Sequence, residues 1–201
     1  MRTETTERTL YQFDELSDDA KQHAIKKLYD INVEHDWWDC TYDTIKTAGA
    51  CLGIRIDDIY FSGFCSQGDG ACLEGNYYYR KGWRAALRAE FGGDTLAELK
   101  RIGQWLQDVQ REAFYSLTAA VKHSGHYYHE LSTTVIVEDM RHSYGYTTES
   151  READVTEALR DFMQWSYQLL RHEYDYLTSE EAIIETIEAN AYEFDENGNL
   201  V

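Results

Sequence analysis

The stretch IYFSGFCSQGDGACLEGNYYY, residues 59–79, decides the fold class that the sequence predicts. Two runs of β-favouring aromatic and branched residues, 59–61 and 76–79, enclose a segment rich in glycine and short polar residues. Such a segment supplies the turn conformations that join antiparallel strands. We therefore expect a β-hairpin whose connecting loop runs from Gly63 to Gly75.

Helical periodicity dominates on both sides of this hairpin. Ser17 and the acids after it are typical of a helix N-terminus, and the apolar spacing predicts a helix to about Asn32. A second helix is expected from Trp38 to Leu52, because Gly53 stands where a helix ends. A long helix is predicted after the hairpin, from Asp94 to about Lys122.

The C-terminal half continues with one strand and two helices. The aromatic and β-branched run at 126–138 predicts a third strand, and a polar loop is expected around 144–146. An amphipathic helix is predicted over 155–169. Thr178, with Glu181 three positions later, fits a capping box before a last short helix.

A turn at Asn197–Gly198 closes this succession of elements. Strands that meet in a hairpin rather than alternating with helices predict an α+β fold. We expect an antiparallel sheet of about three or more strands packed against several amphipathic helices. A single compact domain is predicted over 1–201, with an acidic helical part at about 150–201.

The charge balance limits the kinds of partner. The chain of 201 residues has 19 Lys and Arg against 37 Asp and Glu, a formal net charge of −18. Direct binding to nucleic acid or an anionic membrane is not expected, because both rely on Lys and Arg against phosphate. Residues 151–201 hold 3 of the basic and 13 of the acidic side chains. Partners should therefore be basic, or should have basic sites.

The sequence predicts a cytoplasmic protein. It has no apolar run long enough to cross a bilayer, and residues 1–10 contain no apolar signal core. The four cysteines include no C-x-x-C pair, so free thiols and a reducing compartment are expected.

The first candidate site is an acidic, partner-binding surface. Glu181, Glu185 and Glu188 share one face of the last predicted helix, and no Lys or Arg follows Arg171. One interpretation is a solvated face that keeps the protein soluble. The other is a docking surface for a basic partner, which would resemble nucleic acid if its carboxylates were spaced like phosphates. The remaining members of the predicted surface are Glu180 on the same helix and Glu152, Asp154, Glu157 and Asp161 on the preceding one.

The second candidate is a small hydrolase site at the glycine-rich hairpin. Asp69 or Glu74 could meet His126 or His129 across the sheet and activate a water molecule. The hairpin matches no phosphate-binding loop motif, so glycines that serve tight turns are the alternative. In a strand His126 and His129 would lie on opposite faces, so no metal site is predicted, and no cofactor either.

The hairpin FSGFCSQGDGACLEG (61–75), with YQFDELSDDAK (11–21), HSGHYYHE (123–130) and YEFDENGN (192–199), resembles a set of bacteriophage and prophage proteins. Some of these are labelled as antitoxins of a toxin–antitoxin stability system. The resemblance spans nearly the whole chain. It implies a phage context and the cytoplasm of an infected bacterium.

These observations lead to one expected function. The chain is interpreted as a non-enzymatic phage accessory protein that inhibits or neutralises a host defence or toxin factor. Such anti-CRISPR-like or anti-restriction-like inhibition would use the acidic surface to occupy the site of a basic or nucleic-acid-binding host protein. The sequence leaves open whether the chain forms homo-oligomers.

Overall fold

The structure, a computed structural model, describes residues 8–142, 145 and 147–201. Contacts within the chain divide it into unit 1, Met1–Trp38 with His172–Val201, and unit 2, Asp39–Arg171. In unit 1 the two ends of the chain gather around a small hydrophobic cluster of their own, and the single domain expected from the sequence stays a prediction. The first seven residues and most of the predicted 144–146 loop, Tyr144 and Tyr146, lie outside the described residues.

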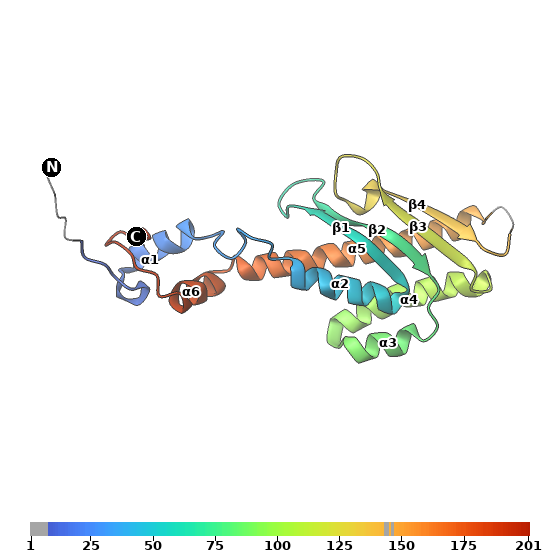
Figure 1. Ribbon diagram of the computed structural model, residues 1–201, viewed down its shortest axis with the longest axis horizontal. Helices are drawn as coiled ribbons and strands as arrows, with labels where there is room; N and C mark the ends of the chain where they lie inside the picture. Colours follow the sequence, from blue (N-terminus) through green and yellow to red (C-terminus); the bar gives the residue numbers. More distant parts are fainter. Residues whose placement is uncertain (1–7, 143–144, 146) are drawn as a thin grey trace, which may run out of the picture. The chain divides into compact units, whose positions relative to one another are not determined.

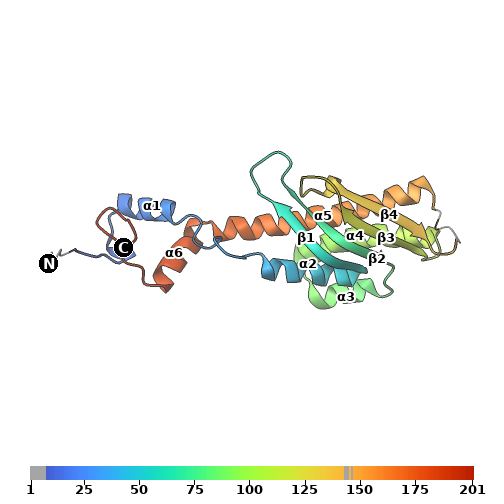
Figure 2. The same ribbon diagram turned by 45° about the horizontal axis from the view of Figure 1, so that its top comes forward.

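Unit 2 contains a four-stranded antiparallel sheet, which confirms the predicted α+β class. The strands are β1 (Ile54–Ser62), β2 (Gly70–Tyr78), β3 (Leu117–His123) and β4 (Thr133–Asp139). They are neighbours in chain order, β1-β2-β3-β4, and each pairs antiparallel with the next (Figure 1). This meander brings the β1–β2 and β3–β4 connections to the same end of the sheet (Figures 1 and 2).

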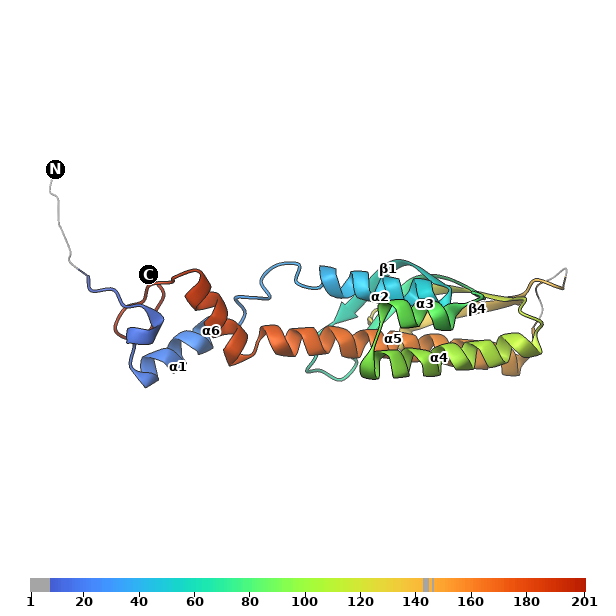
Figure 3. The same cartoon turned by 90° about the horizontal axis from the view of Figure 1, so that it is seen from below.

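The helices of unit 2 lie on one side of this sheet (Figure 3). Along β3 the buried Leu117, Ala119 and Val121 alternate with more exposed residues, as expected for a sheet covered on one face. The covering helices are α2 (Asp39–Leu52), α3 (Trp83–Glu90), α4 (Gly93–Glu112) and the part of α5 (Glu149–Leu177) that belongs to unit 2. Helix α2 ends before Gly53, whose φ is +86°, as the sequence predicts.

The hairpin connection is shorter than expected. Ser62 pairs with Gly70, so the loop spans 63–69 rather than Gly63 to Gly75. The reason is that Ala71, Cys72 and Leu73 are buried in β2 and belong to the packed sheet. The glycines at 63 and 68 lie in the loop, whereas those at 70 and 75 lie in the strand.

The predicted helix to Lys122 is wrong in its last third. Helix α4 ends at Glu112, and the chain turns through Phe114 and Tyr115, whose φ angles are +53° and +63°. The buried side-chain amide of Gln110 then donates to the carbonyl of Leu117 at 2.6 Å and accepts from its N–H at 3.1 Å. This amide satisfies the first residue of β3 and so starts the strand inside the predicted helix.

The predicted strand over 126–138 begins too early. Strand β4 starts at Thr133, preceded by the short 3-10 helix η2 (Glu130–Ser132). His126 and His129 therefore lie in the β3–β4 connection, and the expectation that they occupy opposite faces of a strand is wrong. Hydrogen bonds from Ser124 N–H to Ser132 O and from Ser132 N–H to His129 O fold this connection back on itself.

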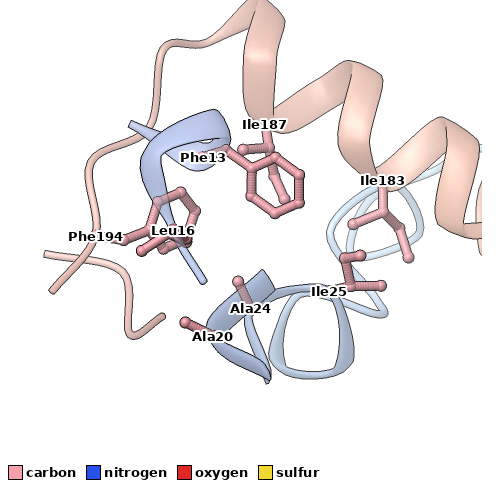
Figure 4. Close-up of a cluster of buried hydrophobic side chains, with 8 residues drawn as sticks. All are labelled: Phe13, Leu16, Ala20, Ala24, Ile25, Ile183, Ile187 and Phe194. Carbon is pink, nitrogen blue, oxygen red and sulfur yellow. The ribbon is translucent and has the colours of Figure 1, made fainter. Parts of the chain in front are cut away.

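Unit 1 is built from both ends of the chain around the cluster shown in Figure 4. It contains the 3-10 helix η1 (Phe13–Glu15), α1 (Asp18–Lys27) and α6 (Glu180–Ala189). Ile183 and Ile187 of α6 pack on the same cluster as Phe13 and Phe194 (Figure 4). The buried members are Phe13, Leu16, Ala20, Ala24, Ile25, Ile183, Ile187 and Phe194.

The helix ends of unit 1 test two predicted caps. Ser17 caps α1 as predicted, its Oγ accepting from Ala20 N–H at 3.3 Å, but the helix ends at Lys27 rather than near Asn32. The predicted cap of α6 is wrong by one residue. Ser179 Oγ accepts from Ala182 N–H at 3.2 Å, whereas the Thr178 hydroxyl donates back to the carbonyl of Tyr174.

The chain ends are joined through Tyr11 and Phe194, which exchange two backbone hydrogen bonds of 2.9 Å. The predicted turn at Asn197–Gly198 is confirmed, with Gly198 at φ +80°. Among the described residues, none of the helices combines the length and the apolar character needed to cross a bilayer.

Candidate functional site

Helix α6 presents its carboxylates away from the core of unit 1. Ala182, Ile183 and Ile187 are buried, whereas Glu181, Glu185 and Glu188 are exposed. With about 3.6 residues per turn, these three glutamates lie on one face, opposite the buried residues. Glu180 is exposed at the start of the same helix. We call these four glutamates the α6 acidic face.

Within the part of the chain that the structure describes, none of the four glutamates forms an ion pair. Their repulsion is therefore not relieved by a Lys or Arg at helical spacing. An acid–acid pair at i, i+4 costs a few tenths of a kcal/mol. The helix tolerates this cost because burial of Ile183 and Ile187 holds it on the unit 1 core.

Two of the four acidic residues predicted on α5 have a different environment, because they are paired with arginines. Asp161 accepts a hydrogen bond from Arg101 at 2.8 Å, and Glu157 accepts one from Arg160 at 2.7 Å. The hydrogen bonds that Arg101 donates to Glu98 and Asp161 also raise its pKa. Glu152 is exposed and Asp154 half-buried. All four belong to unit 2, whereas the α6 acidic face belongs to unit 1.

The acidic residues are distributed unevenly between the two units. Unit 1 has 5 Lys and Arg against 18 Asp and Glu, a net charge of −13 in 68 residues. Unit 2 has 14 against 19, a net charge of −5 in 133 residues. The acidity is thus concentrated in the smaller unit.

Asp195 illustrates a carboxylate of unit 1 with a structural role. Its Oδ1 accepts the backbone N–H of Asn197 at 3.0 Å and of Asn199 at 2.9 Å. These hydrogen bonds, first of all those from Asn199, lower the pKa of Asp195. Asp195 therefore holds the C-terminal turn and is distinct from the α6 acidic face.

In unit 2, Asp69 organises the β1–β2 loop. Its Oδ2 accepts the backbone N–H of Cys65 at 2.9 Å and of Ser66 at 2.6 Å. Glu74 acts similarly at the next strand, because its Oε1 accepts the backbone N–H of His123 at 3.0 Å, beyond the last β2–β3 pair. Both carboxylates satisfy backbone donors.

His129 is also engaged locally. Its Nδ1 lies 3.2 Å from the N–H of Leu131 and 3.0 Å from Glu130 Oε2. Without a proton, Nδ1 accepts from Leu131 N–H, and with one it donates to Glu130. These contacts give structural roles to Asp69, Glu74 and His129, so the hydrolase interpretation depends on His126.

The two loops at this end of the sheet enclose a cleft of about 550 Å³, which we call the loop cleft. It brings together Asp69 and His126, two of the four residues predicted for a hydrolase. It also contains residues to which the sequence analysis gave no catalytic role. The full lining is Ser62, Ser66, Gln67, Gly68, Asp69, His123, Gly125, His126, Tyr127 and Tyr128. These residues are brought together by the strand order β1-β2-β3-β4, which could not be predicted from the sequence.

None of the four cysteines is among the described residues that line the loop cleft. Over residues 8–142, 145 and 147–201, no three His, Cys, Asp or Glu side chains are arranged to hold a metal ion. All four cysteines are free, and burial raises the pKa of the Cys72 thiol to about 12. A thiol with so high a pKa is a poor nucleophile at neutral pH.

Comparison with known proteins places most of the chain in a family. Residues 37–180 match the model of a family described as a domain of unknown function, DUF8835. No curated protein and no solved structure matches the chain. The matched region covers all of unit 2 and extends to the first residue of α6.

Proposed function

The chain belongs to the DUF8835 family, and we propose that it is a phage accessory protein that docks onto a basic host protein through the α6 acidic face. The target would be a defence or toxin factor of the infected bacterium, in its cytoplasm. By occupying the nucleic-acid-binding site of that factor, the acidic face would inhibit or neutralise it. The observation that carries the proposal is the exposed, unpaired set of glutamates on α6.

The spacing of these carboxylates supports competition with nucleic acid. At a rise of 1.5 Å per residue, Glu181, Glu185 and Glu188 extend over about 10 Å of helix axis on one face, or about 5 Å per charge. One strand of duplex DNA carries a phosphate about every 3.4 Å of axis. The spacing of these three carboxylates is therefore of the same order as the spacing of phosphates along one strand.

The charge distribution supports the same target. A single-sign surface steers a basic partner toward it and accelerates association at low salt. Unit 1 has a net charge of −13, so the negative electrostatic field around α6 is reinforced by the other acidic residues of the same unit. A purely solvated surface would carry the same charge but would not select a nucleic-acid-binding protein.

A capture experiment tests this proposal. The immobilised full-length protein is incubated with lysate of the bacterial host, and retained proteins are identified at low and high salt. We expect retention of a nucleic-acid-binding protein at low salt and its release at high salt. The triple variant Glu181→Gln, Glu185→Gln, Glu188→Gln should lose it, because these changes remove three charges with little change of shape.

A matched variant separates the position of the charge from its total. Asp43→Asn, Glu90→Gln and Asp94→Asn remove three exposed acids from unit 2, and none of these acids forms an ion pair within the described residues. This control should capture the same protein as the unmodified chain. Equal loss in both triple variants, or equal retention in both, would contradict a role for the α6 acidic face.

A further inference from the structure

Two sequence motifs that lie about fifty residues apart converge at the loop cleft. Its walls come from the β1–β2 loop, within FSGFCSQGDGACLEG, and from the β3–β4 connection, within HSGHYYHE (Figure 1). A Cβ on Gly70 would lie 2.8 Å from the His129 ring and 3.1 Å from its Cα. The β3–β4 connection therefore packs against the start of β2, and glycine is needed at the contact.

Both walls of the cleft are held in place by internal hydrogen bonds. Asp69 binds the backbone of its own loop, as described above. Nε2 of His123 donates to the carbonyl of Tyr127 at 3.1 Å, and the Ser124 hydroxyl lies 3.2 Å from that of Thr134. A ligand would therefore enter a largely ordered site, which lowers the entropy lost on binding.

Aromatic rings form one side of the cleft. Tyr128 stacks on Tyr60 with ring centroids 5.3 Å apart and an interplanar angle of 15°. Tyr128 remains 38% exposed and is among the residues that line the cleft. Tyr127 is 64% exposed and meets His126 edge-on at 5.5 Å. These rings offer stacking surfaces for a planar molecule.

The polar groups of the cleft are mostly uncharged and unused. Within the described part of the chain, the side chains of Ser62, Ser66, Gln67 and His126 form no hydrogen bond. The described lining residues include no Lys or Arg, and their one carboxylate, Asp69, already accepts from two N–H groups. This lining suits neither a phosphate group nor a metal ion, because each needs charges that the cleft lacks.

We propose that the loop cleft binds an uncharged nucleobase, with Tyr128 stacking on the base and Gln67 hydrogen-bonding its edge. A side-chain amide can donate to and accept from a base edge at once, and tyrosine is a frequent stacking partner of bases. A cleft of about 550 Å³ is large enough for a nucleoside. This site lies in unit 2 and does not depend on the docking proposed for α6.

Ligand-detected NMR on the full-length protein tests the proposal. Adenosine, guanosine, cytidine and uridine are titrated one at a time. Glucose, a sugar without a base, is the control. At least one nucleoside should bind, and Gln67→Ala and Tyr128→Leu should each weaken its binding by about tenfold. The matched controls are Gln168→Ala and Tyr176→Leu, exposed residues outside the cleft that should leave the binding unchanged.

Two further probes identify the source of the base. A nucleoside monophosphate should bind no more tightly than its nucleoside, because no Lys or Arg is among the described residues that line the cleft. A hexanucleotide that binds much more tightly than the nucleoside would assign the site to bases within a strand, and equal affinity would assign it to free nucleosides.

The proposal is overturned if no nucleoside binds at about 10 mM, or if glucose binds in place of nucleosides. It is also overturned if Gln67→Ala, with an unchanged circular dichroism spectrum, binds as tightly as the unmodified protein. That test does not rely on Tyr128, whose contact with Tyr60 also stabilises the loop.

Discussion

Unit 1 and unit 2 differ both in how they are stabilised and in what they expose. Unit 1 packs eight buried apolar side chains between the two ends of the chain and concentrates its charge outside. Unit 2 buries more polar side chains, among them Gln110, Asp139, Thr133 and Ser166, whereas the buried polar side chain of unit 1 within the described residues is Thr178. The comparison indicates that unit 1 is a simple scaffold for a charged surface. In unit 2, buried polar side chains form hydrogen bonds that fix the positions of turns and loops. The two units should therefore respond to different perturbations.

The largest effect is expected in the core of unit 1. Phe194 is fully buried, and its backbone also pairs with Tyr11. Phe194→Ala should lower the free energy of unfolding of unit 1 by about 4 kcal/mol, because it leaves a cavity in a small cluster. Hydrogen exchange followed by mass spectrometry would show faster exchange in the 8–27 and 180–200 peptides. Leu200→Ala, at a position 48% exposed, is the control; equally fast exchange there would argue against the cluster as the centre of unit 1.

The next largest effect is expected from a substitution that weakens the turn between α4 and β3 in unit 2. Gln110→Ala removes three buried hydrogen bonds, two to Leu117 and one to the Tyr77 hydroxyl at 3.3 Å. We expect a loss of about 3 kcal/mol in urea unfolding, because buried groups are left unsatisfied. Gln164→Ala, at an exposed position of α5, should change stability little. A similar small change for Gln110→Ala would mean that the left-handed turn holds without the amide.

Acid should affect unit 2 through Asp139. Hydrogen bonds from Arg141, and then from Ser116, hold the pKa of this buried carboxyl far below its usual range. Its contribution is therefore present above about pH 4, the ordinary value in the unfolded chain, and is lost as the pH falls further. Asp139→Asn should cost about 2 kcal/mol at pH 7 and should flatten the decline below pH 4. Urea unfolding at several pH values measures both, with Asp94→Asn as the exposed control. An Asp139→Asn protein with an undiminished acid decline would contradict this assignment.

The smallest effect concerns the helix caps of unit 1. Ser17→Ala and Ser179→Ala should each cost about 1 kcal/mol, because each removes the oxygen that accepts a first-turn N–H. Ser17→Asp should retain the cap and most of the stability. Thermal unfolding provides the comparison. Thr178→Ala tests the corrected cap of α6: if it affected helix content as strongly as Ser179→Ala, the capping role would have to be shared between the two residues.

The elements with standard local signals could be predicted from the sequence. Three local signals each predict a conformation that few other residues adopt so readily. They are Ser17 before two acids, Gly53 after an apolar helix pattern, and Asn197–Gly198. The hairpin and the antiparallel class followed from its β-favouring runs. These predictions rest on interactions between residues close in sequence, which is why they agree with the structure.

The errors arose where distant contacts override local preference. Phe114 and Tyr115 adopt a left-handed backbone conformation that is usually found at glycine or asparagine. The end of α4 therefore has no local signal in the sequence. Leu117 and Ala120 also continue the helical spacing of α4, although they belong to β3. The loop cleft could not be predicted as a unit, because its two walls meet only through the strand order.

Displacement by DNA tests the central claim, that the α6 acidic face occupies a nucleic-acid-binding site, most directly. A host protein captured by the full-length chain is challenged with duplex DNA of increasing concentration, at constant low salt. Competition for one site predicts that the DNA releases the captured protein, and that the α6 triple glutamine variant never retained it. A captured protein that stays bound while it also binds the DNA would contradict the claim.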